Sequence, residues 1–173
     1  MSTSPPPEGG SDMDQIGVDG SDDDSRSDFT CQEVHSGVEL RTIFEELFEK
    51  FDIAWERTEH DGSYNFLIEN MVVHVHIDQA APAIQLTTGV RTDVTDQVEG
   101  LVIANECNTR ASAARFEFED RIVSATTNYN ATFFVPGAIL QLLFGFQNDV
   151  KSIAGQIPEH ALGTPHEWLE IEP

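Results

Sequence analysis

The chain of 173 residues carries 31 acidic and 9 basic side chains, which gives a formal net charge of −22. Nucleic acids and anionic membrane surfaces are therefore poor partners, because proteins bind both through cationic side chains. The length fits one domain with a hydrophobic core, flanked by tails.

The two ends of the chain differ in composition from its middle. Residues 1–30 are rich in Pro, Gly, Ser and Asp and hold eight acidic residues against the single Arg26. Such a segment buries too little apolar surface to offset its ordering entropy, so a disordered acidic tail is predicted. Residues 31–157 are predicted to form a single domain, and residues 158–173 an extended C-terminal tail.

Cysteine usage and the first residues bear on the compartment. Cys31 and Cys107 are too few for a disulfide framework, so both are expected to be free thiols in a reducing compartment. The first ten residues lack the basic and apolar segments that are typical of a secretion signal. A cytoplasmic location is therefore expected.

Two of the three predicted helices have clear starts. Ser36-Gly37-Val38-Glu39 has the pattern of a capping box and predicts a helix that runs to about Phe51. Pro136 suits the first turn of a final helix that runs to about Ile157. The first half of that final helix is apolar on nearly every side, which is typical of a buried helix or of an interface. In a domain of this size, an interface or a groove is predicted.

A third helix is predicted after residues 92–96, where small polar residues can cap it. Three- and four-residue spacing places four residues on one face, and Ile103 and Cys107 on a neighbouring face. The four are Val98, Leu101, Val102 and Asn105. Because Asn105 continues an apolar row, its carboxamide is predicted to be buried and bonded to backbone, in a structural role rather than a ligand-binding one.

Alternating apolar and polar residues predict the strands. One face of each strand is apolar and the other polar, which indicates an antiparallel sheet with helices on one face and solvent on the other. An Asp-Gly pair at 61–62 favours a tight hairpin between the first two strands. The predicted class is α+β with the order α-β-β-β-(β)-α-β-β-α, the strands lying at 53–59, 64–69, 71–78, about 84–88, 115–119 and 122–132.

One strand offers a candidate metal site. Alternation places His74, His76 and Asp78 on one face of the strand at 71–78, where a cation could meet all three. The alternative is an ordinary solvated sheet face. A nucleophile pair of Cys107 with a histidine is a further candidate. No sequence motif of a known catalytic or nucleotide-binding site is present, so the chain is predicted not to be an enzyme and to hold no cofactor.

A family resemblance rests on short motifs in a fixed order. Asn105-Glu106-Cys107-Asn108 is followed by Arg115-Phe116, by Ile122-Val123 and by a proline-glycine turn before an Ile- and Leu-rich helix. This order resembles the YbjN domain family, which shares its fold with the type III secretion chaperones. The resemblance covers about residues 37–157. The chain departs from the pattern in its longer Asn- and Thr-rich strand at 126–132 and in the cysteine between the two asparagines.

The resemblance implies structural roles for Asn105, Asn108, Arg115 and Phe116. It also implies a function in binding, since relatives are described as peptide-binding, chaperone-like modules and as sensory-transduction or stress regulators. Secretion chaperones of this fold are small, acidic and often dimeric, and they hold an extended partner segment along apolar patches.

Three functional hypotheses follow. The first is a cytoplasmic, non-enzymatic adaptor or chaperone-like regulator that recognises a protein segment through the final helix. The second is a homodimer that covers the same helix by self-association. The third is a metal-dependent enzyme that uses His74, His76 and Asp78. The predicted partner-binding residues of the first hypothesis are Ile139, Leu140, Leu143, Phe144 and Phe146.

Overall fold

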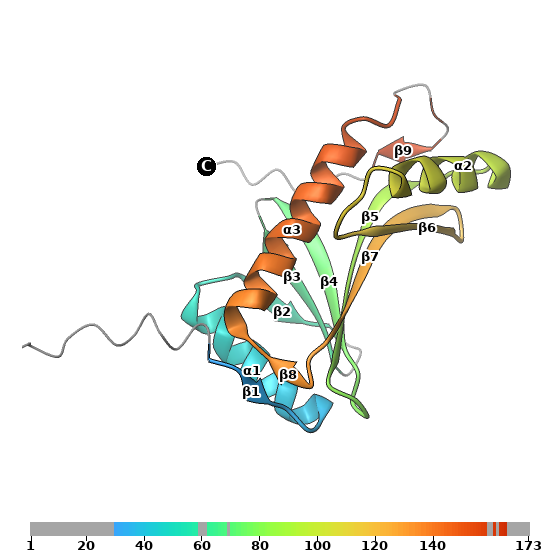
Figure 1. Cartoon of the computed structure of the whole chain (residues 1–173). Helices are drawn as coiled ribbons and strands as arrows, with labels where there is room; N and C mark the ends of the chain where they lie inside the picture. Colours follow the sequence, from blue (N-terminus) through green and yellow to red (C-terminus); the bar gives the residue numbers. More distant parts are fainter. Residues whose placement is uncertain (1–29, 59–61, 69, 159–160, 162, 166–173) are drawn as a thin grey trace, which may run out of the picture.

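The computed structural model describes residues 30–58, 62–68, 70–158, 161 and 163–165, and in this part of the chain three helices cover one face of an antiparallel sheet (Figure 1). The structure confirms the predicted α+β class. The helices are α1 (Gly37–Lys50), α2 (Gln97–Asn108) and α3 (Pro136–Ala154). The predicted tail of residues 1–30 lies, except for Thr30, outside the described residues.

The main sheet contains seven strands in the described residues. Six follow the order β2-β3-β4-β5-β7-β6, all antiparallel, and β9 pairs with the end of β5. A second, two-stranded sheet joins β1 to β8. The two-residue strands β1, β8 and β9 had no signal in the sequence. The strands are β1 (Gln32–Glu33), β2 (Trp55–Arg57), β3 (Ser63–Ile68), β4 (Met71–Ile77), β5 (Ala83–Thr92), β6 (Arg115–Glu119), β7 (Ile122–Asn130), β8 (Phe133–Phe134) and β9 (Thr164–Pro165).

Local sequence explains where the elements begin and turn. The Ser36 hydroxyl accepts a hydrogen bond from the Glu39 amide at 3.2 Å, as the capping pattern predicts. Asp96 caps α2 in the same way. Asp120 and Arg121 both have positive φ, at 48° and 69°, and form the two-residue loop between β6 and β7. Such loops match the twist of a hairpin.

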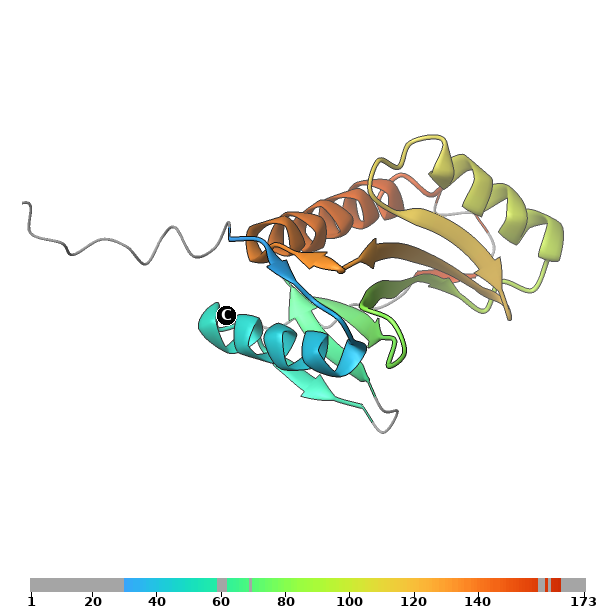
Figure 2. The same cartoon turned by 60° about the horizontal axis from the view of Figure 1, so that its bottom comes forward.

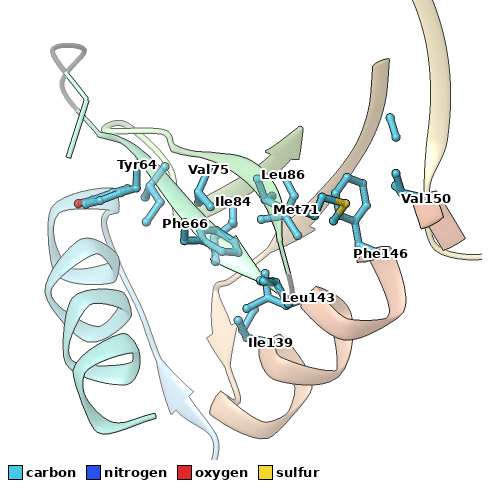
Figure 3. Close-up of a cluster of buried hydrophobic side chains, with 14 of the residues drawn as sticks. Tyr64, Phe66, Met71, Val75, Ile84, Leu86, Ile139, Leu143, Phe146 and Val150 are labelled. Carbon is cyan, nitrogen blue, oxygen red and sulfur yellow. The ribbon is translucent and has the colours of Figure 1, made fainter. Parts of the chain in front are cut away.

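The two faces of the sheet differ as the alternation predicts. In β4, Val73, Val75 and Ile77 are buried, whereas His74 and His76 between them are exposed. We call the buried side the inner face and the other side the polar sheet face. The inner-face side chains of β3, β4 and β5 point toward α1 and α3 (Figure 3).

Helix α1 closes one half of the inner face. Phe48 lies against Phe66 of β3, with ring centroids 5.2 Å apart. At the rim of this contact, the Tyr64 hydroxyl donates a hydrogen bond of 2.8 Å to Glu45 of α1. Burial and the neighbouring Glu45 carboxylate raise the pKa of Tyr64 to about 12. The guanidinium of Arg57 binds both carboxylate oxygens of Glu45, so α1 is tied to β2 and β3 together.

Helix α3 crosses the other half of the inner face and is fixed by its neighbours (Figures 1 and 3). Its buried row packs against the inner face of the sheet and closes this side of the core (Figure 3). Asp149, on a flank of α3, accepts hydrogen bonds from the backbone amides of Ser112, Ala113 and Ala114, in the loop between α2 and β6. The buried row consists of Ile139, Leu143, Phe146, Val150 and Ile153.

The chain after α3 folds back onto the sheet. The buried guanidinium of Arg91 donates to the carbonyl oxygens of Pro158, Ala161 and Gly163 at 3.2, 3.1 and 3.0 Å. In β9, Thr164 pairs with Thr92 of β5. Of the predicted extended tail, residues 158, 161 and 163–165 are therefore docked on the domain. The other residues of the tail lie outside the described part.

Candidate partner-binding surfaces

The predicted partner-binding residues of α3 have two different environments. Ile139, Leu143 and Phe146 are 1%, 1% and 0% exposed and belong to the core. Phe144 is 49% exposed, and Leu140 is partly buried. Three of the five predicted partner-binding residues therefore pack on the sheet, and they belong to the regular three-four row of α3. A partner could contact only Leu140 and Phe144 directly, and that contact stays a prediction.

These two residues continue a row that starts at a small hollow between α1 and α3. Pro136, Leu140 and Phe144 follow one another at four-residue steps and therefore share one side of α3. The hollow has a volume of about 190 Å³, and both apolar and charged residues line it. Its lining residues are Gln32, Ile43, Glu46, Leu47, Lys50, Phe134 and Pro136. We call the hollow and this row the α1–α3 surface.

Helix α2 packs on the sheet through small residues. Gly100, Ala104 and Cys107 are buried, together with Ile103. A Cβ atom built on Gly100 would lie 2.5 Å from the ring of Phe118 in β6. Only a glycine allows the helix to approach this ring so closely, and the contact fixes which side of α2 faces the core.

The opposite side of α2 is apolar and exposed. Val98, Leu101 and Val102 are 71%, 47% and 49% exposed. Asn105, on the same side, is exposed as well. The expectation of a buried Asn105 is therefore wrong, because the apolar row that contains it faces solvent while the small residues face the sheet. We call Val98, Leu101, Val102 and Asn105 the α2 outer face.

The α2 outer face lies at one end of the molecule. In both views α2 lies beside β6 and far from α1, and no helix or strand of the described residues covers its outer side (Figures 1 and 2). A shallow hollow of about 360 Å³ adjoins the face at Leu101. The other lining residues are Val94, Thr95, Gln97, Phe118, Glu119, Asp120 and Arg121.

The remaining motif residues connect α2 to the sheet. The Asn108 side chain donates to the Phe116 carbonyl oxygen at 2.8 Å and accepts from the Phe116 amide at 2.7 Å. This pair of bonds satisfies the backbone amide and carbonyl of Phe116 in β6 as a neighbouring strand would. Phe116 is buried, whereas Arg115 is exposed and forms an ion pair with Glu117 at 3.1 Å. Asn108 therefore links the end of α2 to the start of β6, and the structural roles of Asn108, Arg115 and Phe116 stay predictions.

The metal candidates lie on the polar sheet face. His74 Nδ1 is hydrogen-bonded to the Asn65 side chain, and His76 Nδ1 to the Ser63 hydroxyl at 3.0 Å. Asp78 accepts a hydrogen bond of 2.7 Å from the backbone amide two residues later. Within the described residues, no three His, Cys, Asp or Glu side chains are arranged to hold a metal ion. His74 and His76 are therefore hydrogen-bonded to side chains of β3, and Asp78 to the backbone of the turn after β4.

The two cysteines are free thiols in different surroundings. Cys31 is exposed, and Cys107 is buried on the side of α2 that faces the sheet. Burial raises the pKa of the Cys107 thiol. A buried thiol with a raised pKa is a poor nucleophile, so the structure gives no support to a catalytic pair at Cys107.

The sequence matches the model of one protein family over residues 39–167. The family, TY-Chap1, is described as "T3SS (YopN, CesT) and YbjN peptide-binding chaperone 1". The chain belongs to this family of peptide-binding chaperones. The match includes all three helices except the first two residues of α1, and both candidate surfaces fall almost entirely within it.

Two solved structures share the fold at low sequence identity. A chain of the HopA1–SchA chaperone–effector complex aligns with a TM-score of 0.53 at 12% identity, over 69% of this TY-Chap1 chain and 95% of that chain. YbjN from E. coli aligns with the same TM-score at 6% identity, over 72% and 96%. No curated protein sequence matches. Among the helices in the described residues, none is long and apolar enough to cross a membrane.

Proposed function

We propose that this TY-Chap1 chain is a chaperone-like module that binds a segment of a partner protein and catalyses no reaction. The observation that carries the proposal is the exposure of Val98, Leu101 and Val102 on one side of α2. Large apolar side chains grouped on one side of a surface element mark interaction sites in monomeric proteins. Membership of a peptide-binding chaperone family and the chaperone–effector complex among the similar folds support the same function.

The binding step follows from the shape of the two surfaces. The α2 outer face and the α1–α3 surface present short apolar rows with charged side chains beside them. A partner segment that places apolar residues on these rows removes them from water, which stabilises the complex and keeps the partner's own apolar residues from aggregating. In this proposal the α1–α3 surface contributes through Leu140 and Phe144. If the partner is a cytoplasmic regulatory protein, binding it would give this chain a regulatory role in the cytoplasm.

Affinity purification of the full chain, with a crosslinker added before lysis, tests this function. We expect a discrete partner whose crosslinks map to α2 or to the α1–α3 surface. The partner is then purified, and its dissociation constant is measured against wild type and an L101S/V102S variant. A control bait of similar net charge removes proteins that bind only through charge. If growth under several conditions yields no partner beyond those of the control bait, the proposal fails.

A homodimer is the second candidate, and the α2 outer face is also the observation that favours it. Helix α3, which suggested self-association from the sequence, has its apolar row covered by its own sheet. A dimer through α2 would instead bury Val98, Leu101 and Val102. Multi-angle light scattering decides: a protein that stays monomeric at high concentration rules this candidate out.

A further inference from the structure

A register shift near the end of β5 turns a charged side chain toward the interior. Between Gly89 and Arg91 the pairing with β7 shifts by one residue, so that Arg91 lies opposite the fully buried Val123. Directly opposite residues of an antiparallel pair point to the same face, which places Arg91 on the inner face. Its side chain is only 4% exposed. Bulges often re-aim a side chain near a functional site, and this one directs a guanidinium into the protein.

The contacts of this guanidinium leave one of its sides partly unused. Nη1 donates to the carbonyl oxygens of Ala161 and Gly163, and Nη2 donates to that of Pro158. Within the described residues, the buried Nε–H has no hydrogen-bond partner. Nε and Nη2 share one side of the planar guanidinium, to which the two oxygens of a carboxylate can bind together. Arg91 is therefore a buried cation that only neutral carbonyl oxygens satisfy, with room for a better acceptor.

The residues that cover Arg91 come from the chain after α3. β4 pairs with β5 at residues 84–87, and β9 takes the same edge at residues 91–92. This edge lies at the end of the molecule that also holds α2 (Figure 1). The added strand has two residues, and the second, Pro165, has no N–H to donate to β5. All bonds to Arg91 come from backbone carbonyls of this segment, so another extended chain can make them as well.

Gly163 makes the fit of this covering segment depend on one residue. Its φ is +95°, and a Cβ built on it would lie 2.6 Å from Val94 Cγ2 and 2.7 Å from the carbonyl oxygen of Thr92. Alanine in this position would be strained and would push the segment away from β5. A substitution at Gly163 therefore loosens the covering segment while the guanidinium of Arg91 stays in place.

The net charge of the chain limits which ligand can reach Arg91. At −22, the protein repels a strongly acidic segment at long range. A segment with a single carboxylate and otherwise neutral or basic residues avoids most of this repulsion. Its carboxylate still neutralises Arg91 through charge-assisted hydrogen bonds, which are about twice as strong as those to neutral carbonyls.

We propose that the edge of β5 at residues 91–92 binds an extended segment of a partner protein that carries one carboxylate, and that the chain's own residues 158, 161 and 163–165 occupy this site until the partner displaces them. The partner strand pairs with β5 in place of β9, and its carboxylate binds the Nε and Nη2 side of Arg91. The inference rests on the proposed function, to which it adds a binding site and a competing segment.

Three matched peptides test the site on the full chain by fluorescence anisotropy. Each has about eight residues, enough for one strand, in the same uncharged Thr- and Val-rich sequence with one Gly. The first contains Gln and ends in a free carboxylate, the second contains Glu in place of Gln and ends in an amide, and the third contains Gln and ends in an amide. At least one carboxylate peptide should bind about tenfold more tightly than the third. Comparing the first with the second distinguishes a terminal carboxylate from a side-chain one.

Variants of the chain test the competition. Gly163→Ala should bind the carboxylate peptides about threefold or more tightly than wild type, because weakening the covering segment raises the fraction of open sites. Gly155→Ala is the matched control, because Gly155 has a φ of −67° and a Cβ there would meet nothing closer than 3.4 Å. It should bind as wild type does. Arg91→Lys keeps the charge but loses the planar fork, so it should remove most of the preference for the carboxylate peptides. Circular dichroism checks that each variant is folded.

Displacement of the covering segment has a measurement of its own. Ligands usually slow amide hydrogen exchange where they bind. Here the bound carboxylate peptide should slow exchange in β5 and speed exchange in β9, because β9 leaves the edge of the sheet. The amide peptide with Gln should leave both unchanged at the same concentration.

Four results would overturn the inference. Absence of binding to both wild type and G163A would show that the edge is not a site, and equal affinities for the three peptides would show that Arg91 does not select a carboxylate. Affinity that is no higher in G163A than in G155A would make the covering segment a fixed part of the fold. If a partner found by affinity purification binds R91K as tightly as wild type, this inference fails while the proposed function stands. Peptide binding as expected, with no partner found in cells, would support the site and count against the proposed function.

Discussion

Helices α2 and α3 both carry long apolar runs, but they place them on opposite sides. In α3 most of the larger apolar residues lie against the sheet, and Phe144 is about half exposed. In α2 the small residues around Gly100 lie against the sheet, and Val98, Leu101 and Val102 face solvent. The difference teaches that side-chain volume decides which face packs: a close approach to the Phe118 ring needs the small face of α2, and this leaves its larger residues exposed.

The largest expected loss of stability comes from a core substitution in α3. If this loss is not found, the comparison between α2 and α3 fails. Phe146→Ala removes a fully buried ring from the core and should lower the free energy of unfolding by about 3–5 kcal/mol. Phe144→Ala, two residues earlier on the exposed side, should cost less than about 1 kcal/mol. Urea denaturation monitored by circular dichroism measures both. Similar losses for the two variants would mean that the sides of α3 are assigned wrongly.

A substitution at Asp149 tests the contact between α3 and the loop that follows α2. Burial alone would raise the pKa of Asp149, but the hydrogen bonds from the amides of Ala113, Ser112 and Ala114 lower it more, so the net pKa lies below its ordinary value. Asp149→Asn should lower the free energy of unfolding by about 2 kcal/mol at neutral pH.

The pH dependence of this effect has a definite sign. Because the folded-state pKa of Asp149 is lowered, its stabilisation is present above the ordinary aspartate pKa of about 3.9 and is lost as the pH falls through the folded value. The difference in unfolding free energy between wild type and D149N should therefore shrink in acid. Urea curves at several pH values measure it, and a difference that is constant down to the acid transition would contradict the assignment.

The same substitution in the two helices should have opposite signs. Gly100→Ala places a methyl group into the Phe118 ring and should destabilise the protein by about 1 kcal/mol, even though alanine favours a helix. In α3, a Cβ on Gly145 would meet only the Cβ of Ala113, at 3.8 Å. Gly145→Ala should therefore stabilise the protein by about 0.5–1 kcal/mol. Thermal unfolding compares them, and a stabilising G100A would show that α2 does not depend on close contact with Phe118.

The smallest stability effect is expected on the α2 outer face. Val102→Ser should change the free energy of unfolding by no more than about 0.5 kcal/mol, because the side chain is half exposed. Val150→Ser, the matched change at a fully buried position of α3, should be clearly destabilising. Chemical denaturation of the pair sharpens the contrast between an exposed residue of α2 and a core residue of α3.

Much of the architecture could be read from local patterns. Alternation in residues 71–78 gave the buried and exposed sides of β4, and the capping pattern at Ser36 gave the start of α1. The fold class and the family resemblance could also be predicted, because hydrophobic periodicity and short motifs are local properties of the sequence. The short strands β1, β8 and β9 were not readable, since a two-residue pairing depends only on which segments meet in space.

The candidate site was harder, for a physical reason that α2 and α3 illustrate. Hydrophobic periodicity shows that a helix has an apolar side, but not whether that side is covered. The final helix, apolar on nearly every side, suggested an interface, yet its row of Ile139, Leu143 and Phe146 is core; the row that contains Asn105 suggested burial, yet Val98, Leu101 and Val102 are exposed. The sequence determined the elements and their apolar sides; the tertiary structure alone, through the approach of Gly100 to Phe118, decided which of those sides meets solvent.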